Sequence, residues 1–399
     1  MAFIKLALVF AIIIVLLACK RPLWQAIFGG LVATALFYQI LPLDMARLTG
    51  EVVSSWSSLS VLLSLYLITF LQRILEARSQ IRLAQEDLNG LFHNRRINII
   101  GACLFIGLLP SAASMLLCAE LVKNATDGYL EPKEQAFVAS WVRHIPESTL
   151  PTYTSVLLML SLSGVETGKY MIGMIVPILM LGGLAYFGYL RRVPTTVDTP
   201  QSQNRWMDFV HLFQHLWSLL LILVLILAFH FEVVTAVLVS ILLSIFVYHV
   251  SAQELKTFVV SAFEKKMLGN TFLVLVLKEF LTFTGVLPQL PDVLAKLPLP
   301  TYLIFGLLFF LAAIISGSTA AIAMGTPLAF AALPGGAPLM IFLMCITHAA
   351  MQISPTHVCL VVACDYFHVT LGELVRKTIP MVIAFCVMVT VYYNILMLF

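Results

Sequence analysis

Three ionisable residues, Arg143, His144 and Glu147, lie together in an otherwise apolar stretch of the sequence. Pro146 and Pro151 interrupt the same stretch. Each proline lacks a backbone donor and clashes with the preceding turn, so the two together cannot continue one regular helix. Ionisable side chains at such a depth in an apolar span are costly and indicate a functional site. Two interpretations remain open: a structural Arg143–Glu147 ion pair that closes the break, or an arginine that binds an anionic group.

A second apolar stretch, in the other half of the sequence, is interrupted in a similar way. His348 and His357 stand nine residues apart and flank the sequence Ser354-Pro355-Thr356. A single buried histidine is usually a satisfied core residue, but two histidines beside a helix break favour a site. A histidine there could carry a proton, because its charge changes near physiological pH.

Two further apolar runs, residues 97–121 and 302–333, have polar, helix-breaking centres. We expect hairpins that enter and leave a membrane on one side, because irregular backbone at that depth must be buried in protein or face a wet cavity. Helix N-termini at such breaks attract anions, whereas unwound carbonyls can hold Na⁺. The alternative is tight helix packing by small residues. The candidate residues in the two runs are Ser111, Ser114, Ser316, Ser318 and Thr319.

The composition excludes several classes of protein. Of the 399 residues 61% are hydrophobic and 11% charged, whereas soluble domains have roughly 45–50% and about 25%. The mean hydropathy is +1.00, and the net charge of +3 is too small for a nucleic-acid-binding surface. A soluble enzyme and a disordered chain are excluded too. The seven cysteines form no CxxC pair and lie in apolar surroundings, which favours packing roles.

The apolar stretches predict an all-α polytopic membrane protein. We expect the first stretch to be retained, although residues 16–19 resemble a lipoprotein cleavage box. The predicted spans are residues 2–19, 23–42, 53–74, 133–163, 168–190, 207–230, 233–250, 264–286, 336–364 and 373–398.

The two interrupted stretches also share a pattern. The histidine, proline and threonine at His144, Pro151 and Thr152 recur at His348, Pro355 and Thr356 with the same spacing. This offset of 204 residues also carries Ser114 onto Ser318 and the first predicted span onto the sixth. The pattern predicts two repeats, residues 1–195 and 205–399, joined by a linker at 196–204.

Each predicted repeat contains five spans and one hairpin. Because five is odd, the second repeat enters the membrane from the opposite side, which makes an inverted-topology repeat of the kind found in many secondary transporters. Of the 23 lysines and arginines, seventeen fall on one side of this layout and four on the side of the termini. The positive-inside rule then predicts a multi-pass protein of the cell (inner) membrane with both termini on the extracytoplasmic side.

Three short segments carry a resemblance to a known group of proteins. They are residues 316–320 (SGSTA), residues 354–360 (SPTHVCL) and Asp365-Tyr366-Phe367. In these segments and in its layout the chain resembles the ion transporter superfamily of secondary carriers, which includes gluconate, lactate, citrate and dicarboxylate permeases. It looks closest to an uncharacterised prokaryotic integral-membrane family within that superfamily.

The resemblance implies two inverted repeats with broken helices at the midplane, and a homodimer with separate scaffold and transport parts. It also implies an anionic, usually carboxylate, substrate that is coupled to H⁺ or Na⁺. Sodium-coupled dicarboxylate carriers typically place asparagine beside serine and threonine in both hairpin tips. The tips here lack asparagine, which favours proton coupling.

We therefore predict a secondary active transporter that carries a small organic anion by alternating access, in a homodimer within a lipid bilayer. We expect no enzymatic activity, no nucleic acid partner, and no metal or cofactor beyond the coupling ion. The alternatives are a channel, or an intramembrane hydrolase with a metal held by His144, Glu147, His348 and His357; HExxH and GxSxG motifs are absent. The predicted binding residues are Ser111, Ser114, Arg143, His144, Glu147, Thr152, Ser316, Ser318, Thr319, His348, Ser354, Thr356 and His357.

Overall fold

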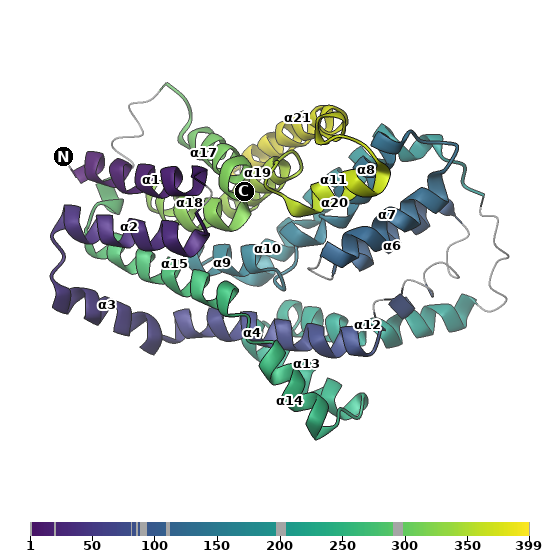
Figure 1. Ribbon diagram of the computed structural model, residues 1–399, viewed down its shortest axis with the longest axis horizontal. Coiled ribbons are helices and arrows are strands. Elements are labelled where there is room, and N and C mark those ends of the chain that lie inside the picture. The colour runs from purple at the N-terminus through teal and green to yellow at the C-terminus, as the bar shows by residue number, and fades with distance from the viewer. Residues whose placement is uncertain are drawn as a thin grey trace.

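The computed structural model describes residues 2–19, 21–80, 82–84, 87, 94–108, 112–196, 205–289 and 298–398. All regular secondary structure in these ranges is helical, which confirms the all-α class (Figure 1). The first half contains α1 (Ala2–Ala18), α2 (Leu23–Tyr38), α3 (Pro42–Ser54), α4 (Trp56–Ala77), α6 (Arg95–Ile106), α7 (Ala112–Thr126), α8 (Pro132–Arg143), η1 (Pro146–Ser148), α9 (Thr154–Ser163), α10 (Thr167–Gly173), α11 (Ile175–Gly188) and η2 (Leu190–Arg192). The second half contains α12 (Arg205–Leu227), α13 (Val233–Val247), α14 (Ala252–Ser261), α15 (Lys265–Phe283), η3 (Leu287–Gln289), α17 (Thr301–Ser316), α18 (Ser318–Ala332), α19 (Gly336–Met351), α20 (Val358–Phe367) and α21 (Leu371–Leu396).

The helices have the lengths and surfaces of a membrane protein. Within the described residues, four helices are long and apolar enough to cross a bilayer, and eight shorter ones are apolar. Large apolar side chains also cover outer surfaces, such as Leu179 on α11 and Phe246 on α13, which are 69% and 77% exposed. Water would penalise such a surface, whereas lipid tails accept it. The long apolar helices are Trp56–Ala77, Thr167–Gly188, Trp206–Leu227 and Leu371–Leu396.

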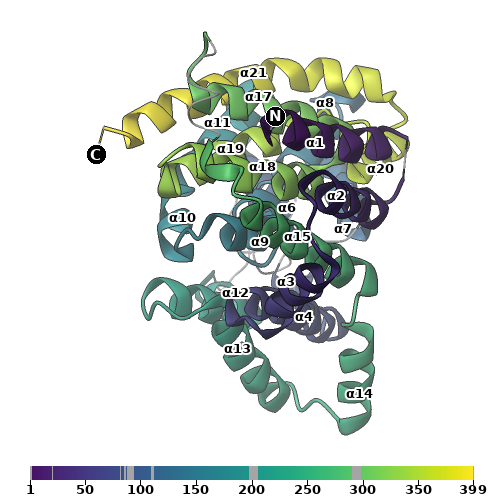
Figure 2. The same ribbon diagram turned by 90° about the vertical axis from the view of Figure 1, so that its left-hand side faces the viewer.

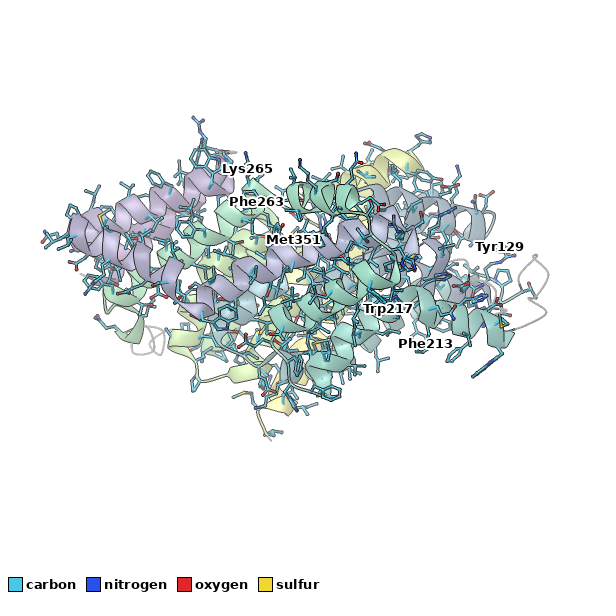
Figure 3. The ribbon with its side chains drawn as sticks, turned by 90° about the horizontal axis from the view of Figure 1, so that it is seen from below. Tyr129, Phe213, Trp217, Phe263, Lys265 and Met351 are labelled. Atoms are coloured by element: carbon cyan, nitrogen blue, oxygen red, sulfur yellow. The ribbon has the colours of Figure 1, made fainter. Side chains whose placement is uncertain are left out.

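The helices form two packed groups. In Figure 2, α3, α4, α12, α13 and α14 occupy the lower part of the molecule, and α4 packs along α13. Above them, α17, α18, α19 and α21 pack together with α8 and α20. Figure 3 shows Phe213 and Trp217 of α12 on the lower face, where Trp217 Nε1 donates a hydrogen bond of 2.9 Å to the hydroxyl of Tyr248. This bond ties α12 to the end of α13.

Two predicted spans are interrupted at their prolines. Residues 133–163 divide into α8, the short η1 that begins at Pro146, and α9, while residues 336–364 divide into α19 and α20. The two apolar runs with polar centres form helix pairs, α6 with α7 and α17 with α18, and the helices of each pair pack against each other. Gly317 joins α17 to α18 with φ of +84°, a conformation that a side chain would strain.

Two helices were not predicted from the sequence. Both α3 and α14 are amphipathic rather than apolar, so a search for continuous apolar spans passes over them. In α3, Leu48 and Val52 are buried while the remainder of the helix is more polar. In α14, Ser251 and Glu254 form a capping box that fixes where the helix begins. Neither helix is among the apolar ones that could span a membrane.

Candidate functional site

A polar cavity of about 330 Å³ lies where the two broken helices meet the α17–α18 pair. A smaller cavity of about 20 Å³ adjoins it and shares Glu147, Ser155, Ser318 and His357 with it. The structure thus brings together two breaks and a hairpin tip that are far apart in the sequence. The larger cavity is lined by Arg143, Glu147, Tyr153, Thr154, Ser155, Ser318, Thr319, His357, Val358 and Cys359. The smaller one adds His144, Ser148, Met344, Thr347, His348, Met351 and Gln352.

Three helices begin at the wall of the larger cavity. Thr154 starts α9, Ser318 starts α18 and Val358 starts α20. None of these three helices has a side-chain hydrogen bond at its N-cap, a feature they share with other helices such as α2 and α13. The first N–H groups of a helix have no partner within the helix and carry partial positive charge. The cavity wall is therefore suited to an anion.

Arg143 is the principal cationic side chain of the cavity wall. It is only 2% exposed, and its Nε and Nη2 donate to Ser114 Oγ at 3.0 and 2.8 Å. Its Nη1 donates to Cys359 Sγ at 3.4 Å and lies 3.8 Å from Glu147 Oε2. These contacts join α7, α8 and α20. The guanidinium is thus held by Ser114 and Cys359 and lies near Glu147, and Arg143 lines the larger cavity.

His144 and His357 lie against each other beside this arginine. Their ring centroids are 4.4 Å apart. His357 Nδ1 donates to the carbonyl of Met351 at 3.1 Å. His144 is 1% exposed, and neither of its ring nitrogens has a hydrogen-bond partner among the residues that the structure describes. Its nearest acidic atom is Glu147 Oε2, 3.8 Å from Nε2.

His348 occupies a more apolar environment in the smaller cavity. Its ring contacts Trp141 and Phe385 edge-on, with centroid distances of 6.3 and 6.1 Å. Its Nε2 lies 3.2 Å from Gln352 Nε2, so the amide donates to the ring in this arrangement. The structure therefore places all three predicted histidines and Glu147 around one small volume.

Other predicted residues lie apart from these cavities. Thr152 lines a separate cavity of about 160 Å³ with apolar residues of α4, α6 and α12, and Ser316 ends α17 without lining either polar cavity. Ser354 Oγ donates to the Ile314 carbonyl at 2.8 Å and is 2.8 Å from Thr356 Oγ1, which braces the break against the hairpin. Ser111 lies outside the described residues.

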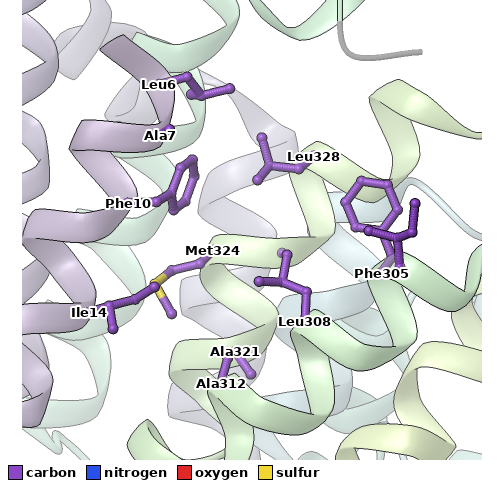
Figure 4. Close-up of a pocket in the computed structure, with 12 residues that line it drawn as sticks. Leu6, Ala7, Phe10, Ile14, Phe305, Leu308, Ala312, Ala321, Met324 and Leu328 are labelled. Atoms are coloured by element: carbon purple, nitrogen blue, oxygen red, sulfur yellow. The ribbon is translucent and has the colours of Figure 1, made fainter. Parts of the chain in front are cut away.

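An apolar cavity of about 250 Å³ lies between α1 and the α17–α18 pair (Figure 4). Phe10 and Ile14 face Leu308 and Met324 across it. No polar side chain lines it. It therefore offers an anion neither charge nor donors, and it is not part of the candidate site.

The interpretation of the sequence missed several residues of the site. The same 204-residue offset that relates His144 to His348 relates Tyr153 to His357 and Ser155 to Cys359. Applied to the predicted His357, the offset points to Tyr153, whereas Ser155 and Cys359 are related only to each other and had no such signal. From the sequence, Cys359 was assigned a packing role because its neighbours in the sequence are apolar. Apolar sequence neighbours do not show whether a side chain lines a cavity in the folded protein.

Comparison with known sequences gives the relationships of the chain. A model of a family described as a protein of unknown function, DUF401, matches residues 2–396. The chain belongs to the DUF401 family. No curated protein is significantly similar to the sequence. The family assignment names no activity, so the function has to be argued from the site itself.

Proposed function

We propose that this member of the DUF401 family is a secondary active transporter of a small organic anion, of the carboxylate class, that works by alternating access. The observation that carries this proposal is the convergence of three uncapped helix N-termini and Arg143 on one cavity. Helix N-termini bind anions through N–H groups and dipole, and an arginine fork matches a carboxylate. The cavity volume of about 330 Å³ suits a small ligand.

Pairs of elements support the predicted two-repeat architecture. Helices α8 and α19 begin 204 residues apart, as do α9 and α20, and α10 and α21. The packing between the halves is reciprocal. Helix α2 packs on α15, and the corresponding pair is α13 with α4. Helix α9 packs on α18, and the corresponding pair is α20 with α7. This reciprocal packing is what a two-fold relation between residues 1–195 and 205–399 would produce. Alternating access in inverted-repeat carriers uses this relation, with the site at the interface of the repeats.

The membrane arrangement follows from the span count. Neither α3 nor α14 is among the apolar helices, which is compatible with the predicted five crossings and one re-entrant hairpin for each repeat. The protein would then lie in the cell membrane with both termini outside, as a homodimer of the type that the ion transporter superfamily suggests. A reporter fused after α21 tests this topology. A cytoplasmic signal would show that the span count, and with it the inversion, is wrong.

The coupling ion is proposed to be H⁺, with Na⁺ as the alternative. His348 is the preferred carrier, because it lines the small cavity and its ring nitrogen already faces the polar Gln352. A protonated His144, by contrast, would stand beside Arg143. The hairpin tips also lack the asparagines expected of a sodium site.

Counterflow in proteoliposomes tests the proposal. Vesicles that contain the protein are loaded with one unlabelled mono-, di- or tricarboxylate and diluted into a trace of the same labelled anion. A carrier gives a transient internal accumulation of label, while a channel gives simple equilibration. Empty vesicles and vesicles with Arg143→Gln are the controls. The absence of counterflow across the whole panel would refute the carboxylate assignment.

A further inference from the structure

We propose that His144, His357 and Cys359 form a binding site for Zn²⁺, with Glu147 as the fourth ligand. The site forms the wall between the two polar cavities. It goes beyond the proposed transport of an anion and does not depend on it.

The donor atoms are close to the spacing that the metal requires. The ligand atoms of His144, His357 and Cys359 all lie within 4.8 Å of one another. Tetrahedral Zn²⁺ with bonds of about 2.0–2.3 Å sets its ligand atoms roughly 3.4–3.7 Å apart. Shifts of about 1 Å would therefore close the site. The distance of 3.8 Å from His144 Nε2 to Glu147 Oε2 is already near that spacing.

The hydrogen bonds around the histidines fit a metal site. His357 Nδ1 donates to the Met351 carbonyl, which places the lone pair of the ring on Nε2, and metal-binding histidines are commonly oriented by a bond of this type. His144 is fully buried with both ring nitrogens unpartnered in the described part of the chain. Buried polar atoms almost always have partners. A metal ion would supply the partner that His144 lacks.

The ligand types and charges select Zn²⁺ over Mg²⁺ or Ca²⁺. Two imidazoles and a thiolate are ligands for a borderline or soft ion, whereas Mg²⁺ and Ca²⁺ prefer oxygen. Zn²⁺ with one thiolate and one carboxylate is neutral as a unit, so the nearby guanidinium of Arg143 does not oppose it. Arg143 Nη1 at 3.4 Å from Cys359 Sγ would act as a hydrogen-bond donor to the bound thiolate, an outer interaction typical of such centres.

Titration of the full-length, metal-free protein in nanodiscs with Co²⁺ tests the site. Co²⁺ takes the place of Zn²⁺ and reports a thiolate ligand through a sulfur-to-cobalt charge-transfer band. We expect one equivalent of Co²⁺ per chain, the charge-transfer band, and displacement of Co²⁺ by Zn²⁺. Cys359→Ser should remove the band, and His144→Gln and His357→Gln should each weaken binding at least about tenfold, the range seen when a metal site is disturbed. Cys386→Ser and His230→Gln, outside the cluster, are the matched controls and should behave as the wild type.

The proposal is overturned if the wild type binds no Co²⁺ or Zn²⁺, or if the band survives Cys359→Ser. It is also overturned if the control variants lose the metal as strongly as the cluster variants. X-ray absorption of the Zn²⁺-loaded wild type needs no variant and decides the case if a substituted protein fails to fold. One sulfur among nitrogen and oxygen neighbours supports the site, and a shell of oxygen alone rejects it.

Discussion

Replacing Arg143 by lysine separates the charge of this side chain from its geometry. In the structure the guanidinium uses Nε and Nη2 on Ser114 and directs Nη1 at Cys359. A lysine ammonium keeps the charge but cannot hold Ser114 and present a two-point contact to a carboxylate at once. If the variant loses one charge-assisted hydrogen bond to the bound anion, the cost is about 1.5–3 kcal/mol. At about 1.4 kcal/mol per factor of ten, KM for counterflow should rise roughly 10- to 100-fold.

The assay is counterflow of the best anion from the panel, with Arg47→Lys as the matched control. Arg47 lies on α3 and has a 57% exposed side chain; it forms ion pairs with Asp44 and Glu51 of its own helix and lies over the Phe283 ring. It lies far from the candidate site in the sequence and lines neither polar cavity, so its variant should transport normally. Elution as a single species in size-exclusion chromatography shows that Arg143→Lys is folded. A folded lysine variant with unchanged KM would return Arg143 to the structural interpretation. It would also remove the arginine from the argument for the function.

Three further outcomes follow from the structure. His348→Gln keeps size and hydrogen bonding but cannot titrate, so proton-driven accumulation should fail while anion exchange persists; full accumulation in this variant across a pH range would place the proton path elsewhere. Gly107→Ala should destabilise the protein by about 1–3 kcal/mol, because the new Cβ would stand 2.3 Å from the backbone oxygen of Arg143. Gly50→Ala is the control, because a Cβ there meets nothing within 4 Å. Equal melting temperatures of the two variants would contradict this prediction. The pKa of Glu254 is lowered from its usual 4.5 to about 2, mainly by the hydrogen bond from Arg78. The ionised carboxylate therefore stabilises the fold above about pH 4.5, and this stabilisation is lost as the pH falls through about 2. Glu254→Gln should therefore lower the melting temperature at pH 7 but not near pH 2, and a pH-independent difference would argue against the pair.

The parts of the fold that follow local rules were predictable from the sequence. The helical class came from long apolar stretches. The interruption after α8 came from Pro146, whose ring cannot sit inside a regular helix. The α17–α18 junction came from the polar, helix-breaking centre of residues 302–333, where Gly317 adopts φ of +84°. Each of these features depends on the residue itself and its immediate neighbours, so no knowledge of the tertiary structure was needed.

The parts that depend on packing between distant segments were not predictable in the same way. Ser354 resembled a binding residue in the sequence, but its hydroxyl bonds to the Ile314 carbonyl. Thr152 lies only one residue from Tyr153, yet the two line different cavities, because the chain turns between them. Cys359 lines the cavity only because the start of α20 meets the end of α8. Whether each of these residues lines the polar cavity depends on the tertiary structure rather than on the residue type.

If the cavity belongs to a coupled carrier, an ion gradient should drive uptake of the anion against its own gradient. Proteoliposomes with the anion found by counterflow are given an inward proton gradient, an inward sodium gradient, or neither. With the proton gradient, the internal anion concentration should rise above the external one, and it should return to equality when the gradient is collapsed. Uptake that only equilibrates under every gradient would contradict a secondary active transporter.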